Sequence, residues 1–307
     1  MADSPGLVQI TGGGPRRTPR RPRLPQWVRG GAAHHESVTA LKRGLRRLNL
    51  HTVCESARCP NLHECFHRGT ATFMILGNLC TRGCGFCSVP KGVPGKHEFQ
   101  LDPGEPANVA RMAAEMRLRY VVITSVNRDD LPDGGAAHFA ETIRCVRARL
   151  PRARIEVLTP DFCGDCGAVR TVLDAGPDVF NHNVETVPRL YRKVRPQADY
   201  LQSLEVLRFA RQHGAAAAVK SGLMVGLGER PEEVEAVMRD LREAGVDVVT
   251  IGQYLQPTRR NLPVAEFVPP DRFEQYRQHG LALGFRAVFS GPLVRSSYMA
   301  ERVWDSL

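Results

Sequence analysis

The fold class is indicated by Thr72-Phe-Met-Ile-Leu-Gly77, which is followed closely by Cys80-Thr-Arg-Gly-Cys84-Gly-Phe-Cys87. A short apolar run that ends at a glycine is typical of a buried strand. Further runs of this kind recur along the chain, at 120–124, 154–158, 178–181, 217–225, 247–252 and 285–289. Strand-helix alternation predicts an α/β protein with a parallel sheet and right-handed crossovers. About six such repeats favour a partial (β/α)6 barrel of the TIM type, with an open doubly wound sheet as the alternative.

Helical periodicity fills the intervals between these strands. One apolar stripe has i, i+3, i+4, i+7 spacing, and it consists of Val109, Met112, Ala113 and Met116. A second stripe begins behind Pro231, a residue suited to the first turn of a helix, and it consists of Val234, Val237, Met238 and Leu241. Both stripes predict helices that cover a sheet.

Polar, glycine-rich or cysteine-rich segments follow the predicted strands. They are 80–87, 125–130, 181–185, 226–229 and 253–258. In a parallel barrel the loops after the carboxyl ends of the strands lie together at one end. We therefore expect a single active site there.

Four regions divide the chain of 307 residues: a tail at 1–24, an extension at 25–71, the barrel at 72–290 and a C-terminal segment at 291–307. The first 30 residues carry six arginines against one acid, Asp3, in a net charge of +10 for the whole chain. Low apolar content and repeated prolines predict that the tail is disordered. The remaining positive charge suits an acidic partner better than nucleic acid.

The tail also bears on localisation. No apolar segment follows its arginines, which argues against a secretory signal, and no run is long enough for a membrane span. Five prolines before Gln26 oppose the amphipathic helix of a mitochondrial transit peptide, although they do not exclude one. We expect a cytoplasmic, bacterial protein without membrane contact.

Nine cysteines cannot all pair within one chain, and six of them fall into two tight triplets: Cys54, Cys59 and Cys65, then Cys80, Cys84 and Cys87. Disulfide partners are usually spread across a framework, so the triplets indicate reduced thiolates that bind metal. The second triplet has C-x3-C-x2-C spacing. Its three thiolates can hold three irons of a 4Fe-4S cluster and leave the fourth iron open. A zinc site completed by a distant histidine or cysteine is the alternative.

The first triplet has C-x4-C-x5-C spacing and also supplies only three thiolates. A second cluster would need a fourth ligand from elsewhere in the chain. The C-terminal stretch Gly291-Pro-Leu-Val-Arg-Ser-Ser-Tyr298 offers hydroxyl groups.

The C-x3-C-x2-C loop after a first barrel strand resembles that of the radical S-adenosylmethionine (SAM) enzymes. With the upstream triplet and the terminal Arg-Ser-Ser-Tyr, the chain resembles the lipoyl synthases over about residues 25–298. Further stretches that carry the resemblance are Glu55-Ser-Ala-Arg-Cys-Pro-Asn61, Thr124-Ser-Val-Asn-Arg-Asp-Asp130, Asn181-His-Asn-Val-Glu185 and Lys220-Ser-Gly-Leu-Met-Val-Gly-Leu-Gly-Glu229. The resemblance implies that Ser297 is the fourth ligand of the auxiliary cluster, with Ser296 as the other possibility.

The resemblance also implies the reaction. In this family SAM binds the open iron and yields a 5′-deoxyadenosyl radical, which removes hydrogen from saturated carbon that no acid or base could deprotonate. Two SAM molecules per lipoyl group lead to sulfur insertion at C6 and C8 of a protein-bound octanoyl chain, with the auxiliary cluster as sulfur donor. The implied partners are an octanoylated lipoyl carrier domain or glycine-cleavage H protein, an electron donor such as ferredoxin or flavodoxin, and an iron-sulfur carrier that rebuilds the cluster.

Other candidate residues are predicted from their position after strands. We expect Asn181, Asn183 and Glu185 to contact SAM, Arg195 and Lys220 to meet the SAM carboxylate or the substrate, and Gln253 to line the pocket. Each also has a plain structural explanation, as a loop, cap or solvated charge. Three cysteines lie outside the family motifs: Cys163 and Cys166 are interpreted as an incidental loop pair, and Cys145 as a small buried residue.

Two other functions compete with this interpretation. Another sulfur-inserting radical SAM enzyme, such as a biotin synthase or a methylthiotransferase, accounts for the 80–87 loop but not for the upstream triplet together with the terminal serines. A non-catalytic iron-sulfur or zinc module accounts for neither open position, since electron carriers fill all four ligand positions. The tail has one aromatic residue near it, Trp27, and so no stacking residues for nucleic acid.

Overall fold

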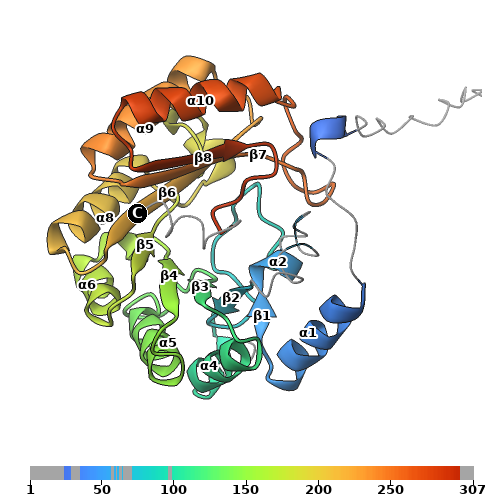
Figure 1. Ribbon diagram of the computed structural model, residues 1–307, viewed down its shortest axis with the longest axis vertical. Helices are drawn as coiled ribbons and strands as arrows, with labels where there is room; N and C mark the ends of the chain where they lie inside the picture. Colours follow the sequence, from blue (N-terminus) through green and yellow to red (C-terminus); the bar gives the residue numbers. More distant parts are fainter. Residues whose placement is uncertain are drawn as a thin grey trace, which may run out of the picture.

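A computed structural model of the chain describes residues 24–28, 35–56, 59, 61, 64, 71–95 and 99–297, without the side chains of 35–38 and 40. Within these ranges one eight-stranded sheet runs in the order β1 to β8, so that each strand pairs with its neighbour in sequence. Figure 1 shows the sheet as a curved wall with most helices on its outer side. No pairing between β1 and β8 is found among the described residues, so the barrel is partial.

Seven strands are parallel, and six crossover helices connect them. The strands are β2 (Thr72–Ile75), β3 (Tyr120–Ser125), β4 (Arg154–Leu158), β5 (Val179–Asn181), β6 (Ala218–Val225), β7 (Val248–Gln253) and β8 (Ala287–Gly291). The crossover helices are α4 (Glu105–Glu115), α5 (Ala136–Arg149), α6 (Cys166–Asp174), α8 (Tyr200–His213), α9 (Pro231–Glu243) and α10 (Pro270–Ala282). The predicted (β/α)6 arrangement is confirmed, with β8 added after the sixth unit.

Burial explains why these segments form strands. Every residue of β2 and β7 is buried, as expected for a parallel sheet covered on both faces. The predicted apolar stripes lie on α4 and α9, and Val109, Val234 and Leu241 are fully buried in the core. Local capping sets the helix ends: Asp199 accepts a hydrogen bond from the Gln202 amide at the start of α8, and Glu233 accepts one from the Arg230 amide at the start of α9.

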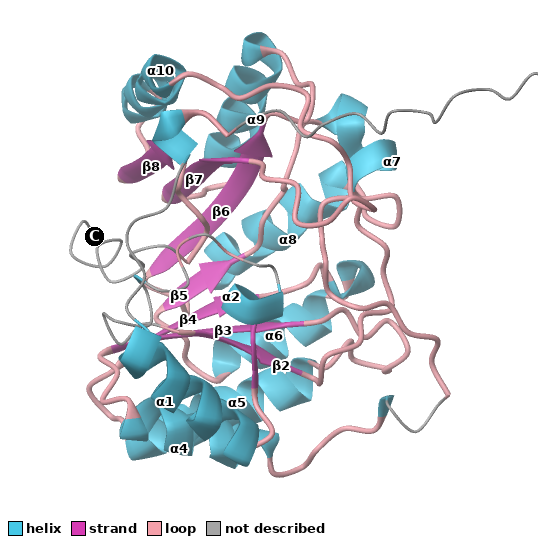
Figure 2. Ribbon diagram, turned by 90° about the vertical axis from the view of Figure 1, so that its right-hand side faces the viewer, coloured by secondary structure: helices cyan, strands magenta, loops and turns pink. Residues whose placement is uncertain are grey.

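The N-terminal extension covers the edge of the sheet. It contains a 3-10 turn η1 (Gln26–Val28), the helix α1 (His35–Arg47), the two-residue strand β1 (His51–Thr52) and the short helix α2 (Val53–Ser56). β1 pairs antiparallel with β2, and His51 lies opposite Met74. Figure 2 shows α2 near the strand ends, with α1 below it beside α4. The extension thus brings Cys54, on α2, up to the barrel.

Short elements complete the described chain: the 3-10 turns η3 (Phe162–Gly164) and η4 (Pro188–Leu190), and the helix α7 (Tyr191–Val194). The predicted disorder of the tail falls on residues almost all of which, 1–23, lie outside the described ranges. In the part of the chain that is described, no helix has the length and apolar character needed to cross a membrane.

Candidate active site

A sharp turn after β2 starts the cysteine loop. Leu76 and Gly77 both have left-handed backbone conformations, with φ of 68° and 86°. The carboxylate of Glu105, at the start of α4, accepts a hydrogen bond from the Leu76 amide at 2.8 Å and also contacts His138 at 2.7 Å. The neighbouring helices therefore fix where the loop leaves the strand.

Backbone amides point at the sulfur atoms of this loop. The Sγ of Cys80 accepts hydrogen bonds from the amides of Arg82 and Asn127, each at 3.4 Å, and the Sγ of Cys87 accepts one from Val89 at 3.5 Å. Such bonds stabilise the negative charge of thiolates and tune the potential of an iron-sulfur cluster.

Glycine is required within the loop because another segment passes close by. A Cβ on Gly85 would lie 2.8 Å from Leu262 and 3.0 Å from the Lys193 carbonyl oxygen. Asn261 donates its side-chain amide to the Cys87 carbonyl at 2.8 Å. The 253–262 loop after β7 thereby holds the cysteine loop in place.

Arg82, which lies between Cys80 and Cys84, is buried and bound by two carboxylates. Its guanidinium makes two 2.7 Å hydrogen bonds to Asp161 and two 2.8 Å hydrogen bonds to Asp129. Burial opposes the ionisation of Asp161, but the hydrogen bonds and charge of Arg82 outweigh it and lower the pKa of Asp161 to about 2. This paired arginine ties the cysteine loop to the loops after β3 and β4.

We expect Asp161→Ala to lower the free energy of unfolding by about 3–5 kcal/mol, because it leaves the buried Arg82 charge without its buried partner. Urea unfolding of the metal-free protein measures this. Asp129→Ala is the matched control, and it should cost less than about 1.5 kcal/mol because the Asp129 side chain is one-third exposed. Equal losses in the two variants would contradict this.

The depressed pKa of Asp161 makes the contribution of the Arg82–Asp161 pair to the free energy of unfolding depend on pH. It is present above the ordinary aspartate pKa near 4 and is lost as the pH falls toward 2.

Three described thiols of the two triplets, those of Cys54, Cys84 and Cys87, are largely shielded from water. Burial, together with the neighbouring Cys59, raises the pKa of Cys54 to about 11, and burial raises the pKa of Cys87 to about 12. Burial also raises the pKa of Cys84. A buried thiolate without a metal is unfavourable, so iron would replace the protons on binding.

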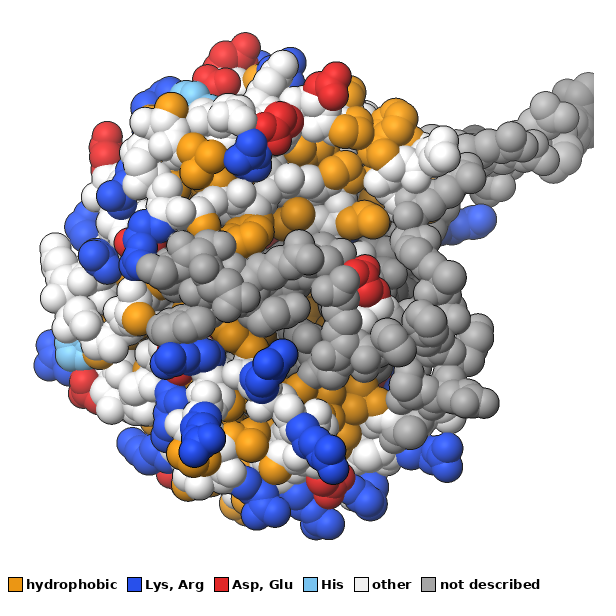
Figure 3. Space-filling view, in the orientation of Figure 1, with side chains coloured by type: hydrophobic (Ala, Val, Ile, Leu, Met, Phe, Trp, Pro, Cys, Tyr) orange, Lys and Arg blue, Asp and Glu red, His pale blue; other side chains and the backbone are white. Residues whose placement is uncertain are grey.

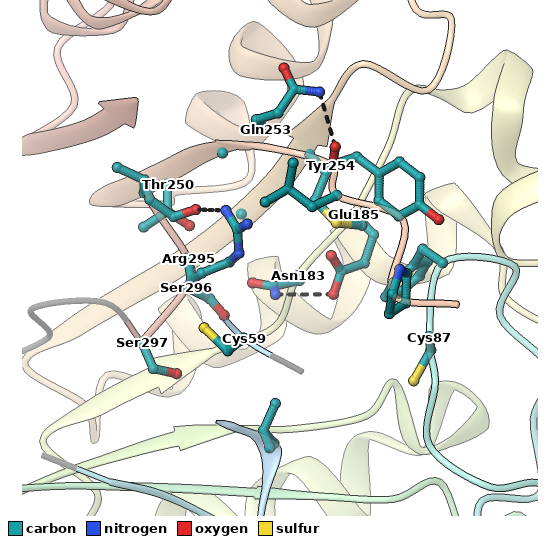
Figure 4. A pocket seen from close by; sticks show the side chains of 18 of the residues that line it. Cys59, Cys87, Asn183, Glu185, Thr250, Gln253, Tyr254, Arg295, Ser296 and Ser297 are labelled. Carbon is teal, nitrogen blue, oxygen red and sulfur yellow. Dashed lines mark hydrogen bonds between the residues drawn. The ribbon is translucent and has the colours of Figure 1, made fainter. Parts of the chain in front are cut away.

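One cavity of about 430 Å³ brings together the N-terminal extension, residues 294–297 and the cysteine loop. Cys54, Cys59, Cys87, Ser296 and Ser297 all line it. In Figure 4, Cys59 and the two serines lie on one side of the pocket and Cys87 on the other, with Asn183 and Glu185 between them. The described members of the predicted auxiliary site thus face Cys87 of the predicted radical site across one cavity.

Asn183 and Glu185 are arranged to bind a polar ligand. The Asn183 amide donates to the Glu185 carboxylate at 3.0 Å, while the Asn183 Oδ1 atom is buried without a partner. Burial raises the pKa of Glu185. Gly222 leaves room beside them, because a Cβ there would lie 3.0 Å from Asn183 Oδ1 and 2.4 Å from Thr250. An unsatisfied buried oxygen in a space kept open by glycine fits a cofactor such as SAM.

Three other residues predicted to contact SAM or substrate have side chains that are hydrogen-bonded to groups of the protein itself. Lys220 is fully buried and bonded to Glu156 and to the Ser296 carbonyl, so it has no donor left for SAM or substrate. Arg195 donates to the backbone carbonyls of Asn183 and Val184. Gln253 lines the pocket as predicted, but its amide is used by backbone groups of the following loop. The charge or polarity of these three side chains was evident from the sequence. The protein groups to which they are hydrogen-bonded were not.

Asn181 and several neighbours at the strand ends have buried polar atoms without a hydrogen-bond partner. The Asn181 amide donates to Glu156 at 3.1 Å, and its oxygen is buried without a partner. His182 Nε2 and Ser125 Oγ are likewise buried and unpartnered. Burial and the charge of Arg195 lower the pKa of His182 to about 4, so its imidazole is neutral. The sequence offered no signal for His182 beyond its position after β5.

The remaining cysteines lie apart from the pocket. Cys163 and Cys166 are exposed, and Cys163 contacts both Arg82 and Asp129 at 3.4 Å. Cys145 is half-buried rather than buried, because it lies on α5 at the margin of the core.

One predicted ligand, Cys65, lies outside the described residues, as does Tyr298 of the Arg-Ser-Ser-Tyr stretch. Within the described ranges no three ligand side chains are grouped as a metal ion requires.

Comparisons with known proteins agree with this geometry. A model of the radical SAM superfamily matches residues 74–241, and a model of the N-terminal domain of lipoyl synthase matches residues 8–59. The chain is 56% identical over 277 residues to lipoyl synthase of Rubrobacter xylanophilus, covering 90% of this chain and 85% of the relative. It is 56% identical over 283 residues to that of Thiobacillus denitrificans, covering 92% and 90%.

Solved structures support the fold. Methylornithine synthase (PylB) superposes with a TM-score of 0.51 at 18% identity, over 78% of this chain and 69% of that one. HydG, a maturase of the [FeFe]-hydrogenase, superposes with a TM-score of 0.55 at 14% identity, over 69% and 49%.

The partial barrel and the three-cysteine loop after its first parallel strand define a radical SAM enzyme. Within that superfamily, the identity over nine-tenths of the sequence decides the matter: the chain belongs to the lipoyl synthase family. Membership implies SAM and two 4Fe-4S clusters as cofactors. The competing functions considered from sequence are therefore set aside.

Proposed function

We propose that this protein inserts two sulfur atoms, at C6 and C8, into an octanoyl group attached to a lipoyl carrier protein. The observation that carries the proposal is the single cavity lined by Cys87 from one triplet and by Cys54, Cys59 and Ser297 from the other site. A radical formed at one side and a sulfur source at the other can then act on one substrate chain between them.

The roles of the ligands are part of the proposal. Cys80, Cys84 and Cys87 hold the cluster that binds SAM. Cys54, Cys59 and Cys65 hold the auxiliary cluster, with Ser297 as its fourth ligand and Ser296 as the alternative. Amide donors to sulfur and the shielding of the thiols from water support the first set. The position of Ser297 in the same pocket as Cys54 and Cys59 supports the second.

For SAM, the proposal rests on Asn183 and Glu185, whose side chains face the pocket beside Gly222. Asn181 and Arg195 act behind them: Arg195 fixes the Asn183 carbonyl, and Asn181 offers a free oxygen. Gln253 shapes the wall through its backbone contacts.

When bound, the clusters and SAM supply the radical and the sulfur that no side chain can provide. The chain's own contribution is binding and exclusion of water. Apolar side chains make up much of the pocket wall, among them Phe86, Val89, Leu223, Met224 and Leu255. An octanoyl chain is favoured in such a space because its apolar surface leaves water.

A basic surface supports the proposal that an acidic carrier protein docks here. Figure 3 shows Lys and Arg side chains gathered on the lower part of one face, where Figure 1 places α1, α4 and α5. α1 alone carries Lys42, Arg43, Arg46 and Arg47. Such a surface attracts an acidic partner. We propose a lipoyl carrier domain or a glycine-cleavage H protein as that partner.

Supply and location complete the proposal. A ferredoxin or flavodoxin would deliver electrons, and an iron-sulfur carrier would rebuild the auxiliary cluster. The relatives are bacterial, which supports a bacterial, cytoplasmic enzyme.

We divide the chain into the tail 1–24, the auxiliary-cluster extension 25–71, the barrel 72–290 and the segment 291–307. The edge pairing of β1 with β2 supports the boundary between extension and barrel.

The test uses the full chain reconstituted anaerobically with iron and sulfide. With SAM, dithionite and an octanoylated carrier domain, we expect each octanoyl group to gain two sulfur atoms while 5′-deoxyadenosine forms. Intact mass of the carrier and chromatography of the nucleoside measure both. Deoxyadenosine without a gain in mass would overturn the proposed substrate.

Ser297→Cys tests the choice of serine. An alkoxide is protonated and released from iron more readily than a thiolate, so the variant should keep the auxiliary cluster but release sulfur at least about tenfold more slowly. Single-turnover formation of the thiolated carrier measures the rate. Ser296→Cys is the matched control, and turnover of Ser297→Cys equal to that of the unmodified protein would refute the argument.

A further inference from the structure

We propose that Lys220 is a positioning residue for the auxiliary site: its ammonium group holds the carbonyl of Ser296 and thereby places the next residue, Ser297, at the cluster. This inference rests on the proposed function of Ser297. It assigns to a barrel lysine a task that is neither SAM binding nor substrate binding.

The contacts of Lys220 are short and fully enclosed. The side chains of Lys220 and Glu156 are both 0% exposed. The ammonium Nζ lies 2.9 Å and 3.2 Å from the two carboxylate oxygens of Glu156 and 2.6 Å from the Ser296 carbonyl oxygen. An ammonium group has three donors, and these three contacts account for all of them.

The position of Glu156 is itself fixed from two sides. The Tyr120 hydroxyl donates to it at 2.7 Å from β3, and the Asn181 amide donates at 3.1 Å from β5. The ammonium therefore cannot shift without breaking a buried network that spans four neighbouring strands. The Ser296 carbonyl is therefore bound to a fully buried ion pair of the barrel.

A further hydrogen bond and a close backbone approach also locate this segment. The Asn61 amide, from the N-terminal extension, donates to the Leu293 carbonyl at 2.7 Å. Gly252 on β7 lets the Val294 carbonyl pass so closely that a Cβ there would lie 2.1 Å from its oxygen. The carbonyls of Leu293, Val294 and Ser296 are thus each located by a different element, and Ser297 follows directly.

Core packing alone does not explain this arrangement. Burying a lysine and a glutamate costs several kcal/mol, and an apolar pair of similar volume would usually be at least as stable. The third hydrogen bond of Lys220 goes to the backbone carbonyl of Ser296, which is 76 residues away in sequence and directly precedes the predicted ligand. What the ionic pair provides and an apolar pair cannot is a fixed donor for that carbonyl.

Lys220→Met is the direct test, since it keeps the length of the side chain and removes the donor. After anaerobic reconstitution we expect the cluster content to fall from two toward one per chain, by iron, sulfide and Mössbauer measurements. SAM cleavage should persist, while sulfur insertion should fall by about 10–100-fold. Amide exchange of residues 293–297 in the metal-free protein should accelerate at least about tenfold, a readout independent of activity.

Gly252→Ala is the second variant, because it displaces the segment without touching the ionic pair. Its outcome should match that of Lys220→Met. Gly104→Ala is the control, since the atoms nearest its new Cβ belong to Asp102 and Asn108, outside the C-terminal segment.

Retention of both clusters and of sulfur insertion in Lys220→Met would overturn the proposal. If Lys220→Met does not fold, retention of both clusters and of sulfur insertion in Gly252→Ala would also overturn the proposal. Failure of the unmodified protein to thiolate any carrier would instead refute the proposed function, and cluster content and amide exchange would still decide the role of Lys220.

Discussion

Replacing Cys84 by alanine is expected to abolish the reductive cleavage of SAM, with a fall of at least about 1,000-fold in 5′-deoxyadenosine formation. The physical reason is that the protein has no radical chemistry of its own, so loss of one of three thiolates removes the cofactor that carries it. Cys84 is half-buried in a loop whose geometry is set by Arg82 and Asn261, and no other described cysteine is placed to replace it. Anaerobic assay with dithionite measures the loss.

The control is Cys145→Ala, on the outer helix α5, which should cleave SAM as the unmodified protein does. The auxiliary cluster should remain in Cys84→Ala, because its ligands come from other segments. SAM cleavage in Cys84→Ala at the unmodified rate would contradict the assignment of the radical site.

Replacing Cys59 by alanine should separate the two halves of the reaction. Sulfur insertion is expected to fall at least about 100-fold, because the auxiliary cluster loses a ligand and the protein loses its sulfur source. SAM cleavage should remain within about threefold of the unmodified rate, because the ligands proposed for the SAM-binding cluster all belong to the 80–87 loop. The measurement compares deoxyadenosine formed with sulfur gained by the carrier, in the same reaction.

Cys166→Ala serves as the control here, since Cys166 is exposed at the start of α6 and does not line the pocket. We expect it to keep both activities. Full sulfur insertion by Cys59→Ala would show that the upstream triplet is not the sulfur source, and loss of SAM cleavage would show that the two sites are not independent.

Much of the fold could be predicted because most of the parallel strands are short runs in which nearly every residue is buried. β7 is the clearest example, with all six residues buried. The two-residue strand β1 and the four-residue helix α7 were not predicted, since elements of that length have no periodicity to detect. Their formation depends on pairing with β2 and packing against the core.

The site was predictable where spacing along the chain carries the chemistry, as in the cysteine triplets. It was not predictable where the chemistry depends on contacts between distant residues. Arg82 and Asp161 are 79 residues apart, and nothing local marks them as partners. Lys220 was assigned to SAM or substrate because sequence shows its charge but not the direction of its side chain, which Glu156 and Ser296 determine.

The origin of the inserted sulfur tests the central claim most directly. The clusters would be reconstituted with ³⁴S-sulfide, excess sulfide removed, and the octanoylated carrier given one round of reaction with SAM and dithionite in the presence of unlabelled sulfide. We expect both sulfur atoms in the product to carry the label, because they leave the cluster held by Cys54, Cys59, Cys65 and Ser297. Unlabelled sulfur in the product would contradict the claim that this protein's own auxiliary cluster is the donor.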